Sequence, residues 1–235
     1  KYCGRLNFEY TTERLDRVIY ALQNANLREN EMSDVVAYMS EATQTARVVD
    51  GLPDKIALRP IKNVGIIGAG TMGGGIAMNF ATAGIPVTIV ETREDALIRG
   101  LSVVRSNYQR SADRGRFAQD EVDTRMALIN GALDIGELAD YDLVIEAVFE
   151  DMNLKKRVFS ELDKICKTDA ILATNTSALN IDEIAAVTSR PQDVIGLHFF
   201  SPANVMKLLE IVRADHTADD GVATSMTLAT TIGKV

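Results

Sequence analysis

A glycine-rich turn near residue 70 constrains the fold of this chain more than any other feature. Residues 64–73 read Val-Gly-Ile-Ile-Gly-Ala-Gly-Thr-Met-Gly, an apolar run that leads into a GxGxxG pattern. This pattern is informative only where it follows a strand and opens a helix. The apolar run predicts a strand at 64–67, and the small and apolar residues that follow predict a helix at 71–83. The segment is therefore expected to form a strand, a tight turn and a helix.

Each glycine of the pattern has a physical role in binding a dinucleotide. Gly68 allows the tight turn, Gly70 lets a pyrophosphate approach the backbone, and Gly73 lets the helix pack close to the strand. The N-terminus of the helix then presents free N–H groups and a partial positive charge to the phosphates. The residues expected to contact the cofactor here are Gly68, Ala69, Gly70, Thr71, Met72 and Gly73.

The next predicted strand, 86–91, ends in an acidic residue, Glu91. A carboxylate in this place accepts hydrogen bonds from the adenosine ribose and repels a 2′-phosphate, so the sequence favours NAD over NADP. Arg93 lies two residues further on and slightly weakens that preference. The alternative is a glycine-rich turn with a solvated glutamate and no cofactor.

From residue 62 onward, apolar strands alternate with helices. This alternation is typical of βαβ units, so we predict an α/β fold, a Rossmann-type doubly wound and mostly parallel sheet with helices on both faces. The expected strands are 64–67, 86–91, 143–147, 170–174, 193–198 and 207–212. The expected helices are 71–83, 93–111, 153–166 and 181–187.

Residues 1–61 differ from this pattern and are predicted to be a helical N-terminal segment with a linker. One amphipathic helix is expected at 11–25, and a second from Ser33 or Asp34, with Met39 on its apolar face. Two prolines and a glycine within 51–60 indicate the linker. The predicted domains are 1–61 and an NAD-binding Rossmann domain at 62–235.

The charge, the glycine content and the cysteines of the chain bear on its partners and its location. The net charge of −8 over 235 residues argues against nucleic acid as a partner. Residues 63–90 carry no charge, but their many glycines argue against a membrane span. The two cysteines, Cys3 and Cys166, form no disulfide or metal pattern, and residues 1–14 contain no apolar signal segment. An intracellular location, bacterial cytoplasm or a peroxisome-like organelle, is expected.

Beyond the turn, the sequence resembles the NAD-binding domain of 3-hydroxyacyl-CoA dehydrogenases. The similar segments are VGIIGAGTMGGGIA, DLVIEAVFED, ATNTSALNI and GLHFFSPANVMKLLEIV, in that order. The segments GLPDKIALRPIKNVGIIGAG and SNYQRSADRGRF, and Ser201 where many single-function members have asparagine, are more similar to multifunctional β-oxidation enzymes that also carry an enoyl-CoA hydratase domain. The resemblance implies NAD-dependent oxidation of L-3-hydroxyacyl-CoA to 3-ketoacyl-CoA.

The resemblance also implies roles for individual residues. His198 takes the place of the catalytic histidine, Glu210 of the glutamate paired with it, and Ser177 of a serine that contacts the substrate oxygen. Cofactor contacts near the nicotinamide half are implied for Glu150, Lys155 and Asn175.

The chemistry of alcohol oxidation suits these residue types. An imidazole accepts a proton near neutral pH, and a carboxylate on its other nitrogen holds the tautomer and stabilises the imidazolium. His198 and Glu210 are twelve residues apart, so only the fold can bring them together. The alternatives are a structural histidine, a helix N-cap at Ser177 and a surface lysine at Lys155.

The family continues with a helical second domain that completes the acyl pocket, and no such segment is present before Val235. We therefore expect a fragment that binds NAD and is weakly active alone. Two other functions stay open: a non-catalytic NAD-binding or interaction module, and a dehydrogenase of the same fold that acts on a small free hydroxy acid.

Overall fold

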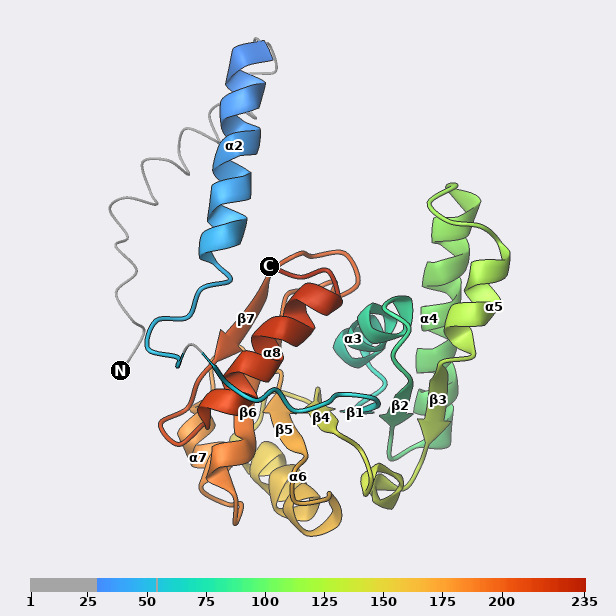
Figure 1. The fold of residues 1–235 in the computed structure, drawn as a ribbon. Helices are drawn as coiled ribbons and strands as arrows, with labels where there is room; N and C mark the ends of the chain where they lie inside the picture. Colours follow the sequence, from blue (N-terminus) through green and yellow to red (C-terminus); the bar gives the residue numbers. More distant parts are fainter. Residues whose placement is uncertain (1–28, 54) are drawn as a thin grey trace. The chain divides into compact units, whose positions relative to one another are not determined.

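A computed structural model describes residues 29–53 and 55–235 (Figure 1). The chain divides after Asp50 into two compact units. The described part of the first unit contains one helix, α2 (Glu29–Thr45), which begins earlier than the expected start at Ser33 or Asp34. The helix expected at 11–25 lies outside the described residues. No helix within 29–53 or 55–235 is long and apolar enough to cross a bilayer.

The second unit is built on a seven-stranded sheet in the order β3-β2-β1-β4-β5-β6-β7. Neighbouring strands are parallel except β6 and β7, which are antiparallel. All residues of β1, β2, β4 and β5 are buried because helices cover both faces of the sheet. The predicted doubly wound, mostly parallel sheet is confirmed. The strands are β1 (Val64–Ile67), β2 (Val87–Val90), β3 (Ile129–Ala132), β4 (Leu143–Glu146), β5 (Ile171–Thr174), β6 (Val194–Phe199) and β7 (Leu209–Val212).

Helices connect the strands on both faces, and Figure 1 shows α3 and α6 on opposite sides of the sheet. On the α6 face, Phe159 and Leu162 pack against Val144 and Leu172 of the central strands. Cys166 belongs to the same cluster, and burial raises the pKa of its thiol to about 11. The helices of this unit are α3 (Thr71–Thr82), α4 (Glu94–Asp113), α5 (Asp120–Met126), α6 (Met152–Ile165), α7 (Ile181–Ala185) and α8 (Asp219–Thr231).

The bounds of the expected elements of this unit agree with the observed ones within two residues. Two α-helices, one strand and two short 3-10 helices, Ile135–Leu138 and Pro191–Asp193, were not predicted. The edge strand β3 reads Ile-Asn-Gly-Ala and lacks an apolar run, so it forms only because it pairs with β2. The short α5 is mostly polar, and α8 is rich in threonine, a poor helix former. Tertiary packing supports these elements more than local propensity does.

Three consecutive glycines in α3 explain how the helix packs so closely. Glycine inside a helix costs about 1 kcal/mol relative to alanine, so its presence needs a compensating contact. A Cβ at Gly73 would lie 1.9 Å from the Gly68 carbonyl oxygen, and one at Gly75 would lie 3.2 Å from Ala203 Cβ. A Cβ at Gly74 would lie 3.1 Å from a Val104 methyl carbon of α4. The glycines thus bring α3 against the turn after β1, against α4 and against the turn after β6.

The segment before β1 is non-helical, as expected for a linker, and its end is tied to the sheet domain. Arg59 pairs with Asp193 at 2.7 Å and with Asp220 at 2.9 Å. Its backbone N–H donates to Thr224 Oγ1 at 2.9 Å. The hydrogen bond from Arg59 holds the pKa of Asp220 below its ordinary value. Residues around Arg59 therefore pack as part of the unit that starts at residue 51.

Candidate functional site

The glycine-rich turn has the geometry of a phosphate cradle. Gly68 adopts a φ of +108°, which favours glycine, and a Cβ there would lie 2.8 Å from the Ala147 carbonyl oxygen. Gly70 is the N-cap of α3, and no side chain caps this helix end. A Cβ added to Gly70 would meet no atom within 4 Å. The space in front of the free helix N–H groups is thus open, which suits a diphosphate.

Glu91 directly follows β2, next to this turn. Its Oε2 accepts a hydrogen bond from the Ala69 N–H at 3.1 Å, and its Oε1 accepts one from the Thr92 N–H at 2.8 Å. The carboxylate therefore lies at the carboxyl edge of the sheet, where doubly wound folds bind ligands. This placement suits the expected contact with a ribose.

The antiparallel pairing of β6 and β7 brings His198 and Glu210 together. The two residues are direct partners in the register, and His198 Nδ1 lies 2.8 Å from Glu210 Oε2. The imidazole is largely buried, with 17% of its side chain exposed. Among the described residues, the structure gives Nε2 no hydrogen-bond partner. The Phe200 ring lies 4.5 Å from the imidazole, centroid to centroid, and forms a wall beside it.

Ser177 and Glu150 meet in the loop after β5. Glu150 Oε1 accepts hydrogen bonds from Thr176 Oγ1 at 2.6 Å, from the Ser177 N–H at 2.9 Å and from Ser177 Oγ at 3.2 Å. Ser177 is not the N-cap of α7, because Asn180 caps that helix by accepting from the Asp182 N–H. The serine hydroxyl is therefore exposed in the loop and is free of a capping role.

Lys155 lies under this loop and is not a surface residue. Only 1% of its side chain is exposed, and its Nζ lies 2.7 Å from Glu146 Oε1 and 3.4 Å from Glu150 Oε2. Glu146, Thr174 and Thr176 form the rest of this buried polar cluster, and none of them was predicted. The available signal was Glu146 itself, a charged residue that ends the apolar run of a buried strand.

Asn175 connects the two strands whose ends carry Ser177 and His198. Its Oδ1 accepts a hydrogen bond from the Phe199 N–H at 2.8 Å. Strands β5 and β6 are parallel neighbours, so their carboxyl ends lie side by side. The asparagine thus ties the loop after β5 to the residue next to His198.

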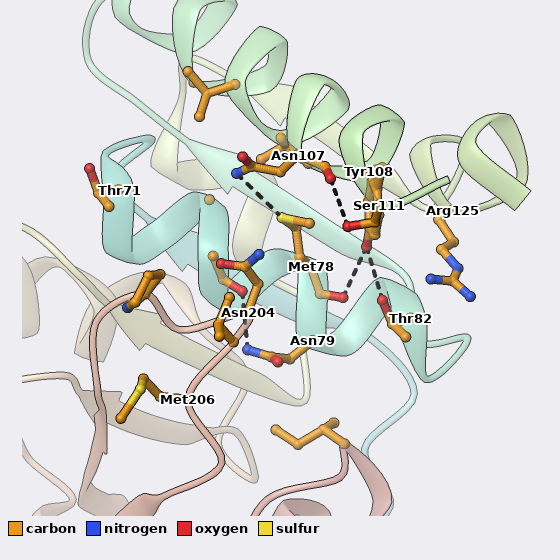
Figure 2. A pocket seen from close by; sticks show the side chains of 18 of the residues that line it. Thr71, Met78, Asn79, Thr82, Asn107, Tyr108, Ser111, Arg125, Asn204 and Met206 are labelled. Carbon is orange, nitrogen blue, oxygen red and sulfur yellow. Dashed lines mark hydrogen bonds between the residues drawn. The ribbon is translucent and has the colours of Figure 1, made fainter. Parts of the chain in front are cut away.

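A cavity of about 1050 Å³ lies between α3, α4 and the turn after β6. Figure 2 shows Met78 and Thr82 of α3 facing Tyr108 of α4, whereas Asn79 points toward the turn after β6 and donates to the Ala203 carbonyl oxygen. Ala69, Gly70, Thr71 and Glu91 line this cavity, whereas the cluster around His198 and Ser177 does not. The predicted residues therefore form two groups, one at the cavity and one at the carboxyl ends of β4, β5 and β6.

Residues 63–235 match the model of a family described as "3-hydroxyacyl-CoA dehydrogenase, NAD binding domain". The chain belongs to this family. Membership makes NAD the cofactor of the domain, and the open cradle at Gly70 and the carboxylate of Glu91 fit that group.

Relatives of this NAD-binding domain are found in longer proteins. A peroxisomal bifunctional enzyme of Cavia porcellus is 50% identical over 76% of the chain, which covers 24% of that enzyme. The solved structure of M. tuberculosis FadB2 is 40% identical with a TM-score of 0.73, over 74% of this chain and 62% of that one. A (S)-3-hydroxybutyryl-CoA dehydrogenase, PaaH1 of Ralstonia eutropha, is 37% identical with the same TM-score and coverage. The NAD-binding domain thus spans about a quarter of the bifunctional enzyme.

Replacing the buried lysine is expected to destabilise the NAD-binding domain strongly. Lys155→Met leaves the buried carboxylate of Glu146 without its counter-charge, so we expect the free energy of unfolding to fall by about 3–5 kcal/mol. Lys156→Met is the matched control, because Lys156 pairs with Glu183 near the surface, and it should change stability by less than about 1 kcal/mol. Urea unfolding measures both, and equal effects of the two variants would contradict this account.

Proposed function

We propose that this chain is the cofactor-binding domain of an NAD-dependent L-3-hydroxyacyl-CoA dehydrogenase. The parent protein would oxidise 3-hydroxyacyl-CoA to 3-ketoacyl-CoA in fatty-acid β-oxidation, and this domain alone would be weakly active. The observation that carries the proposal is the 2.8 Å pair of His198 and Glu210, at the carboxyl edge of a sheet whose first turn is an NAD cradle.

The geometry supports a division of roles in proton transfer. NAD bound to this domain would supply the hydride acceptor for the oxidation. Glu210 holds the proton of the imidazole on Nδ1, which leaves Nε2 of His198 as the base for the substrate hydroxyl. Glu210 then stabilises the imidazolium that forms. Ser177 contacts the substrate oxygen from the neighbouring loop, with its O–H turned from Glu150 Oε1 to that oxygen when substrate binds.

The cofactor contacts follow the two groups of residues. The turn would hold the diphosphate, and Glu91 would accept hydrogen bonds from the adenosine ribose. The residues of the turn are Gly68, Ala69, Gly70, Thr71, Met72 and Gly73. We propose that Glu150 and Asn175 contact the nicotinamide half. Direct contact of Lys155 with the cofactor stays a prediction. The ammonium of Lys155 is buried against Glu146. Lys155 therefore acts on the nicotinamide half of the site through its ion pair with Glu150.

The basic side of the cavity supports an acyl-CoA substrate. Although the chain carries a net charge of −8, this cavity is lined by several arginines from α4, α5 and the segment between them. Guanidinium groups bind phosphate in a bidentate manner, so these arginines offer partners for the phosphates of coenzyme A. Two of the arginines already pair with carboxylates of the chain, Arg99 with Asp95 and Arg125 with Glu121. The arginines are Arg99, Arg110, Arg114, Arg116 and Arg125.

Titration of the 235-residue chain with NADH, followed by cofactor fluorescence, tests the cofactor assignment. We expect saturable binding, and a linear response would contradict it. Acetoacetyl-CoA reduction by the parent protein tests the reaction. Turnover of 3-hydroxybutyrate but not of its CoA ester would favour a dehydrogenase of free hydroxy acids. NADH binding without turnover in the parent would favour a non-catalytic module.

Glu91 is expected to set the choice between NAD and NADP. Glu91→Gln keeps the shape of the side chain and removes the charge that repels a 2′-phosphate. The ratio of the affinity for NADH to that for NADPH should therefore fall about tenfold, which corresponds to the loss of roughly one charge-assisted hydrogen bond. Glu94→Gln, on the exposed first turn of α4, is the control, and fluorescence titrations with NADH and NADPH give the ratio. An unchanged ratio for Glu91→Gln would remove Glu91 from the site.

We propose a multifunctional parent protein in which an enoyl-CoA hydratase domain and a C-terminal dehydrogenase domain accompany this one. The proposal rests on the relatives, which include bifunctional and multifunctional proteins of which the chain spans about a quarter. Several of these relatives are named as peroxisomal, which supports a peroxisome-like compartment for the parent.

A further inference from the structure

A fully buried carboxylate lies under the loop that carries Ser177. Glu146, the last residue of β4, has no exposed side-chain surface. Its Oε1 accepts hydrogen bonds from Lys155 Nζ at 2.7 Å and from the Val148 N–H at 2.8 Å. Its Oε2 accepts one from Thr174 Oγ1 at 2.7 Å. Such a buried ion pair adds little stability over apolar residues of similar volume, so its presence calls for another explanation.

The same ammonium faces a second carboxylate, and the two are not equivalent. Lys155 Nζ lies 2.7 Å from Glu146 and 3.4 Å from Glu150. Glu150 is 41% exposed and directs its Oε1 at the loop of residues 176–178. Burial raises the pKa of Glu150, but the hydrogen bonds from Thr176 and Ser177, together with the charge of Lys155, hold that pKa below its ordinary value.

We infer that Glu146 is a positioning residue that sets the place of Ser177 through Lys155 and Glu150. Two carboxylates compete for one ammonium, and Glu146 holds it with the shorter contact. Glu150 is thereby left to accept the N–H groups of Ser177 and Ala178 and the two hydroxyls of the loop. Without the charge of Glu146, the ammonium would pair fully with Glu150 and draw it away from the loop. The catalytic meaning of this inference rests on the proposed role of Ser177.

Amide hydrogen exchange in the 235-residue chain, followed by NMR, tests the geometry without any activity. In Glu146→Gln, the Ser177 and Ala178 amides should exchange about tenfold faster, because each loses a hydrogen bond to a charged acceptor. The Asp182 amide, which donates to Asn180 in α7, should keep its rate. Glu161→Gln, on the exposed face of α6, is the matched control. Unchanged rates at Ser177 and Ala178 would overturn the inference.

A second pair of variants covers the case in which Glu146→Gln does not fold. Thr174 is buried and donates to Glu146 from β5. Thr174→Ser keeps the hydroxyl and should preserve the exchange rates of the loop. Thr174→Val keeps the shape but removes the donor to Glu146 and the acceptor of the Thr176 N–H, so the Ser177 and Ala178 amides should exchange severalfold faster. Equal rates in the two variants would contradict the inference.

Kinetics of the parent protein separate a positioning role from a merely structural one. Glu146→Gln should lower kcat about tenfold. KM for NAD should rise by less than that, since the cradle at Gly70 is not part of this cluster and only the proposed contact of Glu150 with the nicotinamide half is disturbed. Thr174→Ser should retain the wild-type kcat. If the wild-type protein shows no turnover but the exchange effect is present, the proposed function fails and the positioning role of Glu146 stands. If turnover is present and neither kcat nor exchange responds to Glu146→Gln, the inference fails alone.

Discussion

Replacing His198 by alanine should lower kcat/KM of the parent protein for acetoacetyl-CoA reduction by about 100-fold to 10,000-fold. The imidazole supplies the proton that the keto oxygen gains in this direction and accepts it in the other. Glu210 is not expected to take over in this variant, because its carboxylate lies beside the place of Nδ1, on the far side of the ring position from Nε2. Steady-state kinetics with NADH at saturating concentration measure the loss.

The control for this variant is the second histidine of the chain. His216 is exposed in the turn before α8, and His216→Ala should leave kcat/KM within about twofold of the wild-type value. NADH affinity should be unchanged in both variants, because His198 is not among the residues that line the cavity at the glycine turn. Retention of full activity by His198→Ala would remove the histidine from the catalytic role.

Gly70→Thr should weaken NADH binding by about 100-fold with little change in stability. Threonine is about as good an N-cap as glycine, and Gly70 has a φ of −72°, which any residue adopts. A side chain there meets no protein atom within 4 Å, so the fold tolerates it. That same space is where the diphosphate is expected, and displacing it loses about 2–3 kcal/mol of charge-assisted hydrogen bonds.

Gly73→Ala distinguishes this effect from general damage to the turn. Its Cβ would lie 1.9 Å from the Gly68 carbonyl oxygen, so this variant should unfold at lower urea concentration as well as bind NADH poorly. Gly70→Thr should lose binding alone. If Gly70→Thr bound NADH with wild-type affinity, the cofactor would not occupy the cradle at the start of α3. Fluorescence titration and urea unfolding of the 235-residue chain supply both measurements.

The success of the strand and helix predictions has a local cause. β1, β2, β4 and β5 are buried on both faces, so each is mostly apolar, with Thr88 inside β2 and Glu146 and Thr174 at the ends of β4 and β5. Strand β3 was not predicted because its sequence, Ile-Asn-Gly-Ala, contains no apolar run. Strand β3 forms because it hydrogen-bonds to β2, and β2 is far from β3 in the sequence.

The sequence by itself determined the glycine turn, the acidic residue that follows the next strand, and the types of the residues proposed to be catalytic. Each of these is local, because a turn or a strand end is specified within a few residues. The tertiary structure alone decided how the residues meet. Antiparallel pairing places Glu210 opposite His198, and the parallel neighbours β4 and β5 bring Glu146 to Thr174. Burial of Glu146 and Lys155 is likewise a property of the packed sheet and α6, and no spacing in the sequence encodes it.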